Sequence, residues 1–330
     1  MKLSLKQKIF LAGLDFTLGV LVLIAKFFSF KGLLKFLIVF LLFVGLVRGC
    51  PLSVSTKTLP VFRRDTYLPL SIPVDTLELK DVHREFPDIS AKAILVVDLT
   101  TDQVLHEKNA DLALAPASVT KLMSALVAQD IYDHMDVLEV PLECVQLPGM
   151  KLGLFAEEKL SYLDLLNATL IASSNDATCT LANGFISQEA FVEKMNEKAM
   201  RLGLTSTHFT NPVGFDDPDF NHFSTARDLY KLGESVKKDP VLSNIVRKKS
   251  YTLSSGQLMR TAYSTNQLLW TIPETVGIKT GTTTLAGQVL IYEYRDSSRD
   301  KDLLIVLMGS QDRFGEVNQI LDWVSSRFVW

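Results

Sequence analysis

The stretch Pro116-Ala-Ser-Val-Thr-Lys121 opens an amphipathic run that we expect to be helical to about Ala128. Proline is tolerated at the first position of a helix, because the first amide protons have no partner within the helix. Residues three positions apart lie on one helix face, so this spacing brings the Ser118 hydroxyl close to the Lys121 amine. A serine hydroxyl needs a base beside it to become a nucleophile, and a lysine whose pKa is lowered by burial can be that base. The motif predicts a reactive Ser118, although an ordinary helix start with a solvated lysine would have the same sequence.

A second motif, Ser173-Ser-Asn175, lies where one predicted helix ends and another begins. In a cleft, a serine hydroxyl can pass a proton to a leaving group, and an asparagine side chain can bind both a carbonyl group and a lysine. An interhelical turn with a helix N-cap uses the same residue types. Alone, this motif leaves the catalytic and the structural interpretation open.

A third motif, Lys279-Thr-Gly281, lies in a segment where Val276, Ile278 and Thr280 alternate with other residues. That alternation predicts an edge strand, and a glycine in a strand allows a ligand to approach the backbone closely. Lys279 and Thr280 could then bind a carboxylate. The alternative is a surface strand with a solvated lysine that ends in a turn.

Hydrophobic periodicity places strands at both ends of the region after residue 90 and helices between them. Strands that are far apart in sequence are therefore expected to join one sheet beside a helical lobe, with the site between the two. We expect strands at 93–97, 103–106, 288–294 and 303–308, and helices at 162–171, 191–202, 225–236 and from 314 to about 328.

Charge and hydropathy divide the chain into two unlike parts. Residues 1–50 carry seven Lys and Arg residues against one Asp, whereas the other 280 residues carry 27 Lys and Arg residues against 36 Asp and Glu residues. An acidic body argues against a nucleic-acid partner, since phosphate backbones attract a basic surface. Residues 9–25 are mostly apolar but contain Asp15, and residues 36–47 are apolar with no charge, whereas a membrane-spanning helix needs roughly 20 apolar residues. We expect residues 1–50 to be an N-terminal membrane anchor or signal region, which spans once or twice or is cleaved. Residues 51–87 are expected to be a Pro- and Thr-rich linker, and residues 88–330 the folded domain.

The chain contains three cysteines, Cys50, Cys144 and Cys179. Gly49-Cys50 follows an apolar segment, as a lipoprotein cleavage site does, but an unmodified cysteine at a membrane edge fits equally. A Cys144–Cys179 pair is conceivable if the domain is exported, and the spacing alone does not establish it. No HExxH-type or CxxC spacing occurs, so we expect no metal and no other cofactor.

The three motifs are far more specific together than any one of them. Ser173 follows Ser118 by 55 residues, and Lys279 follows Ser173 by 106 residues. This order of SxxK, SxN and KTG is shared by penicillin-binding proteins and class A β-lactamases. Residues from about 88 to 328 resemble the serine-type D-alanyl-D-alanine carboxypeptidases, the low-molecular-mass penicillin-binding proteins of peptidase family S11. Further stretches that are similar to this family are Asn211-Pro-Val-Gly214, Phe223-Ser-Thr-Ala-Arg-Asp228, Leu268-Leu-Trp270, Gly277-Ile-Lys-Thr-Gly-Thr282 and Ala286-Gly287.

The resemblance implies an α/β (α+β) fold of the β-lactamase/transpeptidase type, in which helices flank an antiparallel sheet beside a helical lobe. It implies hydrolysis of the terminal D-Ala from peptidoglycan stem pentapeptides, acylation by β-lactam antibiotics as inhibitors, and no cofactor. Because that substrate lies outside the cytoplasmic membrane, we expect the N-terminal segment to anchor the protein in the cell membrane with the catalytic domain outside the cytoplasm.

The resemblance also assigns roles to individual residues. Ser118 attacks the carbonyl carbon of the D-Ala–D-Ala bond, and Lys121 takes the Ser118 proton. Ser173 passes a proton to the leaving D-Ala, while Asn175 positions the substrate and Lys279 supports the electrostatics around Ser173. The substrate-binding residues are Lys279, Thr280, Gly281 and Thr282, and the backbone amides of Ser118 and Thr282 form the oxyanion hole.

Three other functions are weighed against this one. A class A β-lactamase needs a Glu-x-x-x-Asn element after SxN, and the corresponding Phe209-Thr-Asn-Pro-Val-Gly214 contains no Glu. A DD-endopeptidase, which cuts peptidoglycan cross-links, uses the same residues and is not separated by the sequence. A non-catalytic peptidoglycan-binding module is the third, although every catalytic position here is filled. Three positions depart from the family, with Ser174 where Gly is usual, Thr265 where Arg is frequent and Gln267 where Gly is frequent, and the last two bear on substrate preference.

Overall fold

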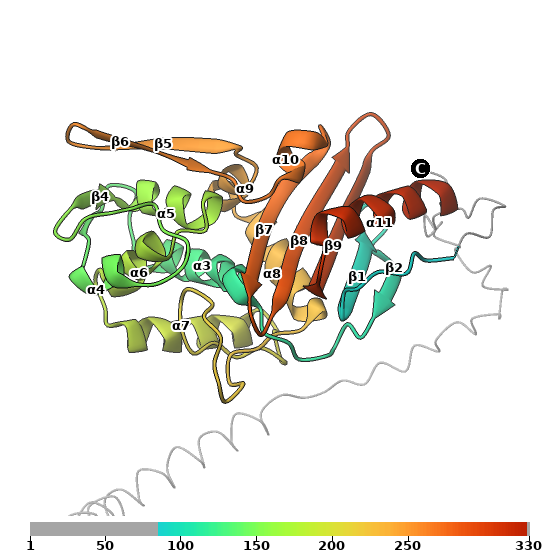
Figure 1. The fold of residues 1–330 in the computed structure, drawn as a ribbon, viewed down its shortest axis with the longest axis horizontal. Coiled ribbons are helices and arrows are strands. Elements are labelled where there is room, and N and C mark those ends of the chain that lie inside the picture. The colour runs from blue at the N-terminus through green and yellow to red at the C-terminus, as the bar shows by residue number, and fades with distance from the viewer. Residues whose placement is uncertain (1–84, 329–330) are drawn as a thin grey trace, which may run out of the picture. The chain divides into compact units, whose positions relative to one another are not determined.

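The main sheet consists of five antiparallel strands that come from the two ends of the described chain, which is residues 85–328 of the computed structural model. The strands are β1 (Ala93–Asp98), β2 (Gln103–Lys108), β7 (Thr275–Thr283), β8 (Gly287–Asp296) and β9 (Lys301–Ser310), in the spatial order β2-β1-β9-β8-β7. Pairing of β1 with β9 joins the two ends (Figure 1), and β7 remains an edge strand.

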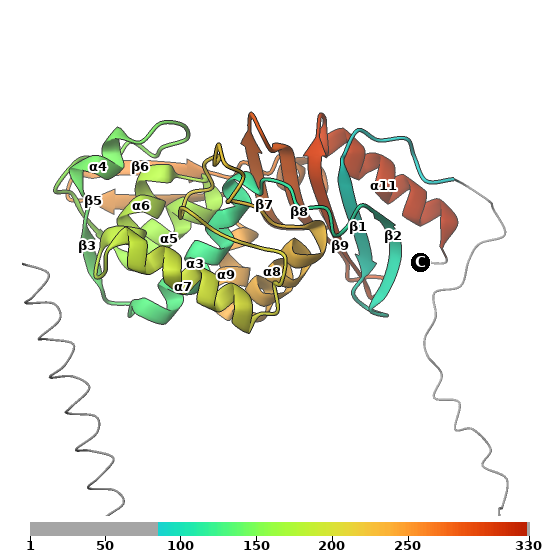
Figure 2. The ribbon, with the colours of Figure 1, turned by 90° about the horizontal axis from the view of Figure 1, so that it is seen from below.

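The other elements lie mostly between β2 and β7 in the sequence, and most of them form a helical lobe beside β7 (Figures 1 and 2). Two small antiparallel pairs are β3 (Val137–Glu139) with β4 (Lys159–Ser161), and β5 (Ser250–Ser255) with β6 (Leu258–Tyr263). The helices are the 3₁₀ turn η1 (Ala117–Thr120), α3 (Lys121–Ile131), α4 (Leu142–Gln146), α5 (Tyr162–Ile171), α6 (Asn175–Asn183), α7 (Gln188–Arg201), α8 (Ala226–Lys238), α9 (Pro240–Val246), α10 (Leu268–Thr271) and α11 (Arg313–Arg327).

Both faces of the main sheet are covered, which explains why its central strands are continuous apolar runs. Successive side chains of a strand point to opposite faces. In β9, the even-numbered residues from Leu304 to Met308 pack into the core shared with α8, and the odd-numbered residues from Leu303 to Leu307 pack into the core under α11. The two helices lie on opposite sides of the sheet (Figure 1).

Helix α3 is the centre of the helical lobe. The sequence pattern predicts an amphipathic helix here, and this expectation is wrong, because every residue from Lys121 to Ala128 is buried. Helices α5, α6, α7 and α8 all pack against α3, so that its first two turns have no solvent face. This packing removes the Lys121 amine from water.

The predicted α/β fold class, with an antiparallel sheet and a helical lobe, is confirmed. The predicted strands and helices occur with ends shifted by a few residues, and the run after Pro116 begins as a 3₁₀ turn before α3. Helices α4, α9 and α10 and the pairs β3–β4 and β5–β6 were not predicted from the sequence. These elements are short, and hydrophobic period is a weak signal over three to seven residues.

Of the helices between residues 85 and 328, none combines the length and the apolar character that crossing a membrane requires. The expected anchor or signal region at residues 1–50, including Cys50, and nearly all of the expected linker at 51–87 lie outside the described residues.

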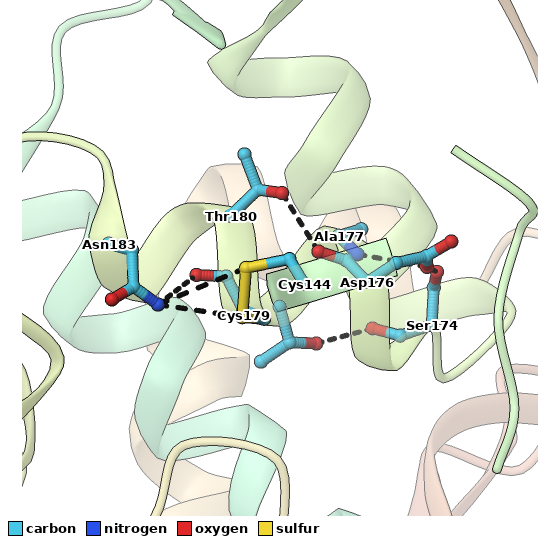
Figure 3. The surroundings of a disulfide bond; sticks show 8 residues. Cys144, Ser174, Asp176, Ala177, Cys179, Thr180 and Asn183 are labelled. Atoms are coloured by element: carbon cyan, nitrogen blue, oxygen red, sulfur yellow. Dashed lines mark hydrogen bonds between the residues drawn. A yellow bond between two sulfur atoms is a disulfide. The ribbon is translucent and has the colours of Figure 1, made fainter. Parts of the chain in front are cut away.

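A disulfide joins Cys144 of α4 to Cys179 of α6, with an S–S distance of 2.05 Å (Figure 3). The sequence alone leaves this pairing open. Asn183, one turn further along α6, donates from Nδ2 to the Cys179 carbonyl at 2.9 Å. Since α6 begins at Asn175, the bond fixes α4 to the helix that carries a predicted site residue.

A buried histidine is hydrogen-bonded to the turn that carries Ser118. His222 is 2% exposed, and its Nε2 lies 2.8 Å from the Thr120 hydroxyl oxygen. The Thr210 amide donates to His222 Nδ1 at 3.0 Å, so the ring proton sits on Nε2 and is donated to Thr120. Burial lowers the pKa of His222 to about 4, which keeps the ring neutral at pH 7.

Replacing the disulfide in a Cys144→Ala/Cys179→Ala variant is expected to lower the free energy of unfolding by about 2–4 kcal/mol, since a crosslink that closes a loop restricts the unfolded chain. Urea denaturation of the oxidised proteins, followed by circular dichroism, measures the difference. The Cys50→Ser variant is the control and should match the parent protein. Equal stability of the double alanine variant and the parent would contradict this expectation.

The neutral His222 predicts that the protein loses stability as the pH falls. In the unfolded chain the histidine takes up a proton near a pKa of about 6.5, whereas in the folded chain it does so only at about 4. Between these values the unfolded state binds more protons, so lowering the pH favours unfolding, by about 3 kcal/mol for this group once the pH is below both values.

Denaturation curves at about pH 7 and about pH 5 test this linkage. The loss of stability should shrink in His222→Gln and persist in His134→Gln, which changes an exposed histidine. A pH dependence that is the same in all three proteins would refute the role given to His222.

Candidate active site

Three segments that are far apart in the sequence meet where the helical lobe adjoins β7. They are η1 with the start of α3, the turn between α5 and α6, and β7 itself, and η1 packs directly against β7. Side-chain hydrogen bonds link the SxN motif to each of the other two, through Asn175 with Lys121 and through Ser173 with Lys279. The structure therefore brings the predicted site residues into one cluster.

Ser118 and Lys121 are in contact across one turn of the chain. Lys121 Nζ lies 3.0 Å from Ser118 Oγ, 2.8 Å from Asn175 Oδ1 and 2.6 Å from the Val213 carbonyl oxygen. The Lys121 side chain is fully buried, and this burial, with a smaller contribution from the charge of Lys279, lowers the pKa of Lys121 well below its ordinary value. A lysine amine with a lowered pKa gives up its own proton more readily, and in its neutral form it can accept the proton of the half-buried Ser118.

Ser173 contacts a second buried lysine. Lys279 Nζ donates to Ser173 Oγ at 2.8 Å and to the Thr280 carbonyl at 3.0 Å. Ser173 has a φ of 58°, a left-handed conformation that is uncommon for a residue with a side chain and that clusters at functional sites. Burial, followed by the charge of Arg313, lowers the pKa of Lys279 to about 7, so both protonation states of this amine are accessible near neutral pH.

Asn175 is oriented by the loop between α4 and β4. Its backbone amide donates to the Met150 carbonyl, and its Nδ2 donates to the Pro148 carbonyl, each at 2.8 Å. With Nδ2 held in this way, Oδ1 faces Lys121. Gly149 has a φ of 84°, and a Cβ there would lie 2.9 Å from Asn175 Nδ2, so the loop can take this path only with glycine.

Asp176 anchors the same loop from α6. Its buried carboxylate accepts the backbone amides of Leu152, Gly153 and Leu154 at 3.0–3.1 Å. Charged hydrogen bonds of this kind compensate for removing a carboxylate from water. Figure 3 shows Asp176 on the helix that also carries the disulfide. The disulfide and the hydrogen bonds of Asp176 therefore both attach the chain before β4 to α6.

Strand β7 approaches the Ser118 turn so closely that no side chain fits at Gly281. A Cβ on Gly281 would lie 2.8 Å from the Ser118 amide nitrogen. Gly214 has a φ of 87°, and a Cβ there would collide with the Ala117 carbonyl oxygen. The backbone at both glycines therefore lies close to the peptide that joins Ala117 to Ser118.

Two residues that contact β7 next to the Lys279-Thr-Gly281 motif were not predicted as site residues from the sequence. Arg313, the first residue of α11, donates from Nη1 to the Gly281 carbonyl and to Thr282 Oγ1, each at 2.7 Å. Thr265 Oγ1 lies 2.6 Å from Thr280 Oγ1. For Arg313 the sequence has no signal beyond its place at a helix start, and Thr265 is noticeable in the sequence only as a departure from the family.

The family model described as Peptidase_S11, D-alanyl-D-alanine carboxypeptidase, matches residues 80–312. The D-alanyl-D-alanine carboxypeptidase DacB2 of Mycobacterium tuberculosis is 35% identical over 210 residues, which is 62% of this chain and 70% of the relative. The D-alanyl-D-alanine endopeptidase of Escherichia coli is 31% identical over 254 residues, which is 73% of this chain and 79% of the relative.

A solved structure has the same fold. The crystal structure of a D-alanyl-D-alanine carboxypeptidase from Mycobacterium tuberculosis matches with a TM-score of 0.69 and 30% identity, over 74% of this chain and 96% of that one. The family model covers well over half of the 330 residues. The resemblance seen in the three motifs is thus confirmed, and the chain belongs to the S11 peptidase family of D-alanyl-D-alanine carboxypeptidases.

Proposed function

We propose that this peptidase removes the terminal D-Ala from peptidoglycan stem pentapeptides through an acyl-enzyme on Ser118. The observation that carries the proposal is the 3.0 Å contact between Ser118 Oγ and the fully buried Lys121 amine, whose pKa is lowered. A serine beside a base of this kind is what acyl transfer requires. The substrate class is supported by the similarity to DacB2 of Mycobacterium tuberculosis, which is named a D-alanyl-D-alanine carboxypeptidase.

In the acylation step, Ser118 Oγ bonds to the carbonyl carbon of the D-Ala–D-Ala bond, and its proton passes to Lys121 Nζ. Asn175 Oδ1 and the Val213 carbonyl hold that amine in place before and after the transfer. The carbonyl oxygen becomes negative, and we assign its stabilisation to the backbone amides of Ser118 and Thr282. The close approach of Gly281 to the Ser118 amide supports this pair. One such donor typically contributes about 3 kcal/mol to lowering the barrier.

The C–N bond then breaks, and the leaving D-Ala amine needs a proton. We assign this proton to Ser173 Oγ, and the assignment is supported by the Lys279 amine 2.8 Å away, which in its protonated form would stabilise the oxygen left behind. We assign the free carboxylate of the leaving D-Ala to Lys279, Thr280 and Thr282, where Arg313 adds a further positive charge. Water then attacks the Ser118 ester, its oxygen bonds to the acyl carbon and the bond from that carbon to Ser118 Oγ breaks. The proton held by Lys121 and one proton of the water restore the hydroxyls of Ser118 and Ser173, and the shortened stem peptide is released.

A DD-endopeptidase activity is the second candidate. The specific observation in its favour is the 31% identity to the Escherichia coli relative that is named a D-alanyl-D-alanine endopeptidase. The same serine and lysines would act on a cross-linking bond. Comparing products from a pentapeptide and from cross-linked muropeptides separates the two, and we expect faster release from the pentapeptide.

The proposed function has implications for the domain organisation of the chain and for its inhibitors. We propose that residues 88–330 are the catalytic domain and that residues 51–87 link it to residues 1–50, which anchor it in the cell membrane or direct its export. The catalytic domain would then lie outside the cytoplasm, where peptidoglycan is found. β-Lactam antibiotics are expected to acylate Ser118, as membership of a penicillin-binding family implies.

Benzylpenicillin is expected to add one adduct to the protein, detected by intact-protein mass spectrometry, because its carbonyl would be attacked by Ser118. The Ser118→Ala variant should carry no adduct and should release D-Ala from a pentapeptide at least about a thousandfold more slowly. The control Ser254→Ala, which changes an exposed serine of β5, should behave like the parent. An adduct that persists in Ser118→Ala, or rapid penicillin hydrolysis with no adduct, would contradict the proposal. The same spectrum reports whether residues 1–50 are retained.

The lowered pKa of Lys279 predicts a fall of kcat/KM above about pH 7. The proposed roles at Ser173 and at the substrate carboxylate need the protonated amine, and the protonated fraction decreases as the pH rises through this pKa. An arginine stays charged throughout, so Lys279→Arg should have a lower maximum and no fall in this range. A profile of kcat/KM against pH for both proteins is the measurement, and an identical alkaline fall in Lys279→Arg would show that another group causes it.

A further inference from the structure

We propose that Thr265 is a positioning residue for the substrate carboxylate, because its hydroxyl fixes the Thr280 hydroxyl as a donor to that group. The inference rests on the proposed function, in which Thr280 binds the free carboxylate of the terminal D-Ala. It identifies what makes the site prefer a free carboxylate over a neutral chain end.

Thr265 connects the two sides of the cluster. It lies in the turn between β6 and α10, and its backbone amide donates to the carbonyl of Ile171 at 3.2 Å. Ile171 is the last residue of α5, two positions before Ser173. The side chain of Thr265 reaches β7, where its Oγ1 lies 2.6 Å from Thr280 Oγ1. One residue thus sets the position of the KTG strand relative to the segment that leads into Ser173.

The proton count of the two hydroxyls gives this contact a direction. A hydroxyl donates one proton and can accept two hydrogen bonds. If Thr280 donates to a carboxylate, it has no proton left for Thr265, and the 2.6 Å contact is then made by Thr265 donating to Thr280. The order is Thr265 to Thr280 to carboxylate, and hydrogen bonds in such a chain strengthen one another.

The burial of Thr280 means that the direction of its hydroxyl proton depends on its protein partners. Thr280 is 3% exposed, so little water is available to replace a lost partner. The Lys279 amine donates to the carbonyl of Thr280, and Arg313 donates to the hydroxyl of Thr282. Positively charged groups are therefore already present near Thr280. Thr265 adds no charge, and its contribution is the direction of one donor.

The test compares two peptides that differ only at the chain end, one with D-Ala-D-Ala as the free acid and the other with its C-terminal carboxamide. In Thr265→Val, which keeps the shape and removes the hydroxyl, kcat/KM for the acid should fall about tenfold, mainly through KM. The value for the amide should stay within about twofold of the parent, and Thr265→Ser should restore the preference for the acid. If Thr265→Val does not fold, Thr265→Ala is read in the same way.

The matched control is Thr261→Val, which removes a hydroxyl from the exposed Thr252–Thr261 pair on the β5–β6 hairpin and should leave both substrates unaffected. A double-variant comparison isolates the coupling: once Thr280→Val is present, adding Thr265→Val should not change the acid-to-amide ratio further. An equal loss on acid and amide in Thr265→Val, or an unchanged ratio, would overturn the inference. Failure of the proposed function is distinct, because the parent protein would then form no benzylpenicillin adduct on Ser118.

Discussion

The structure depends on keeping two lysine amines out of water within one cluster. Lys121 and Lys279 are both at most 1% exposed, and an isolated buried ammonium is strongly unfavourable. Each amine therefore has to be surrounded by oxygens, which are Ser118, Asn175 and Val213 for Lys121, and Ser173 and Thr280 for Lys279. Burial also brings both pKa values down from the ordinary lysine range, so the feature that costs stability is the one that makes the amines useful in proton transfer.

The architecture supplies these oxygens from segments that are distant in the sequence. The first two turns of helix α3 are buried by other helices, which places the start of the helix in the interior of the lobe. The sheet is packed on both faces, and its edge strand β7 lies against the Ser118 turn at a distance that only Gly281 permits. The loop between α4 and β4 holds the start of α6, since it accepts a hydrogen bond from Asn175 and donates backbone amides to Asp176.

Much of this arrangement could be predicted from the sequence, and the rest could not for physical reasons. Long apolar runs such as Leu303 to Met308 identify buried strands, and the spacing of Ser118, Ser173 and Lys279 identifies the family. By contrast, the contact of Arg313 with Thr282 depends on how α11 is placed after β9, and no local pattern encodes it. The same holds for the three amides on Asp176 and for the hydroxyl pair of Thr265 and Thr280, which join segments more than ten residues apart. The pairing of Cys144 with Cys179 was chemically possible, but only the packing of α4 on α6 decides it.

The disulfide has a further consequence for the integrity of the chain. Cys144 and Cys179 enclose the whole loop that carries Met150 and Phe155, two apolar residues that are well exposed. Exposed loops are where proteases cut most readily. A single cut between residues 144 and 179 would leave both chain ends covalently joined, so the nicked molecule would keep α4 attached to the helix that starts at Asn175. For a catalytic domain that lies outside the cytoplasm, as proposed above, a cut in this loop would therefore not separate the two parts of the chain.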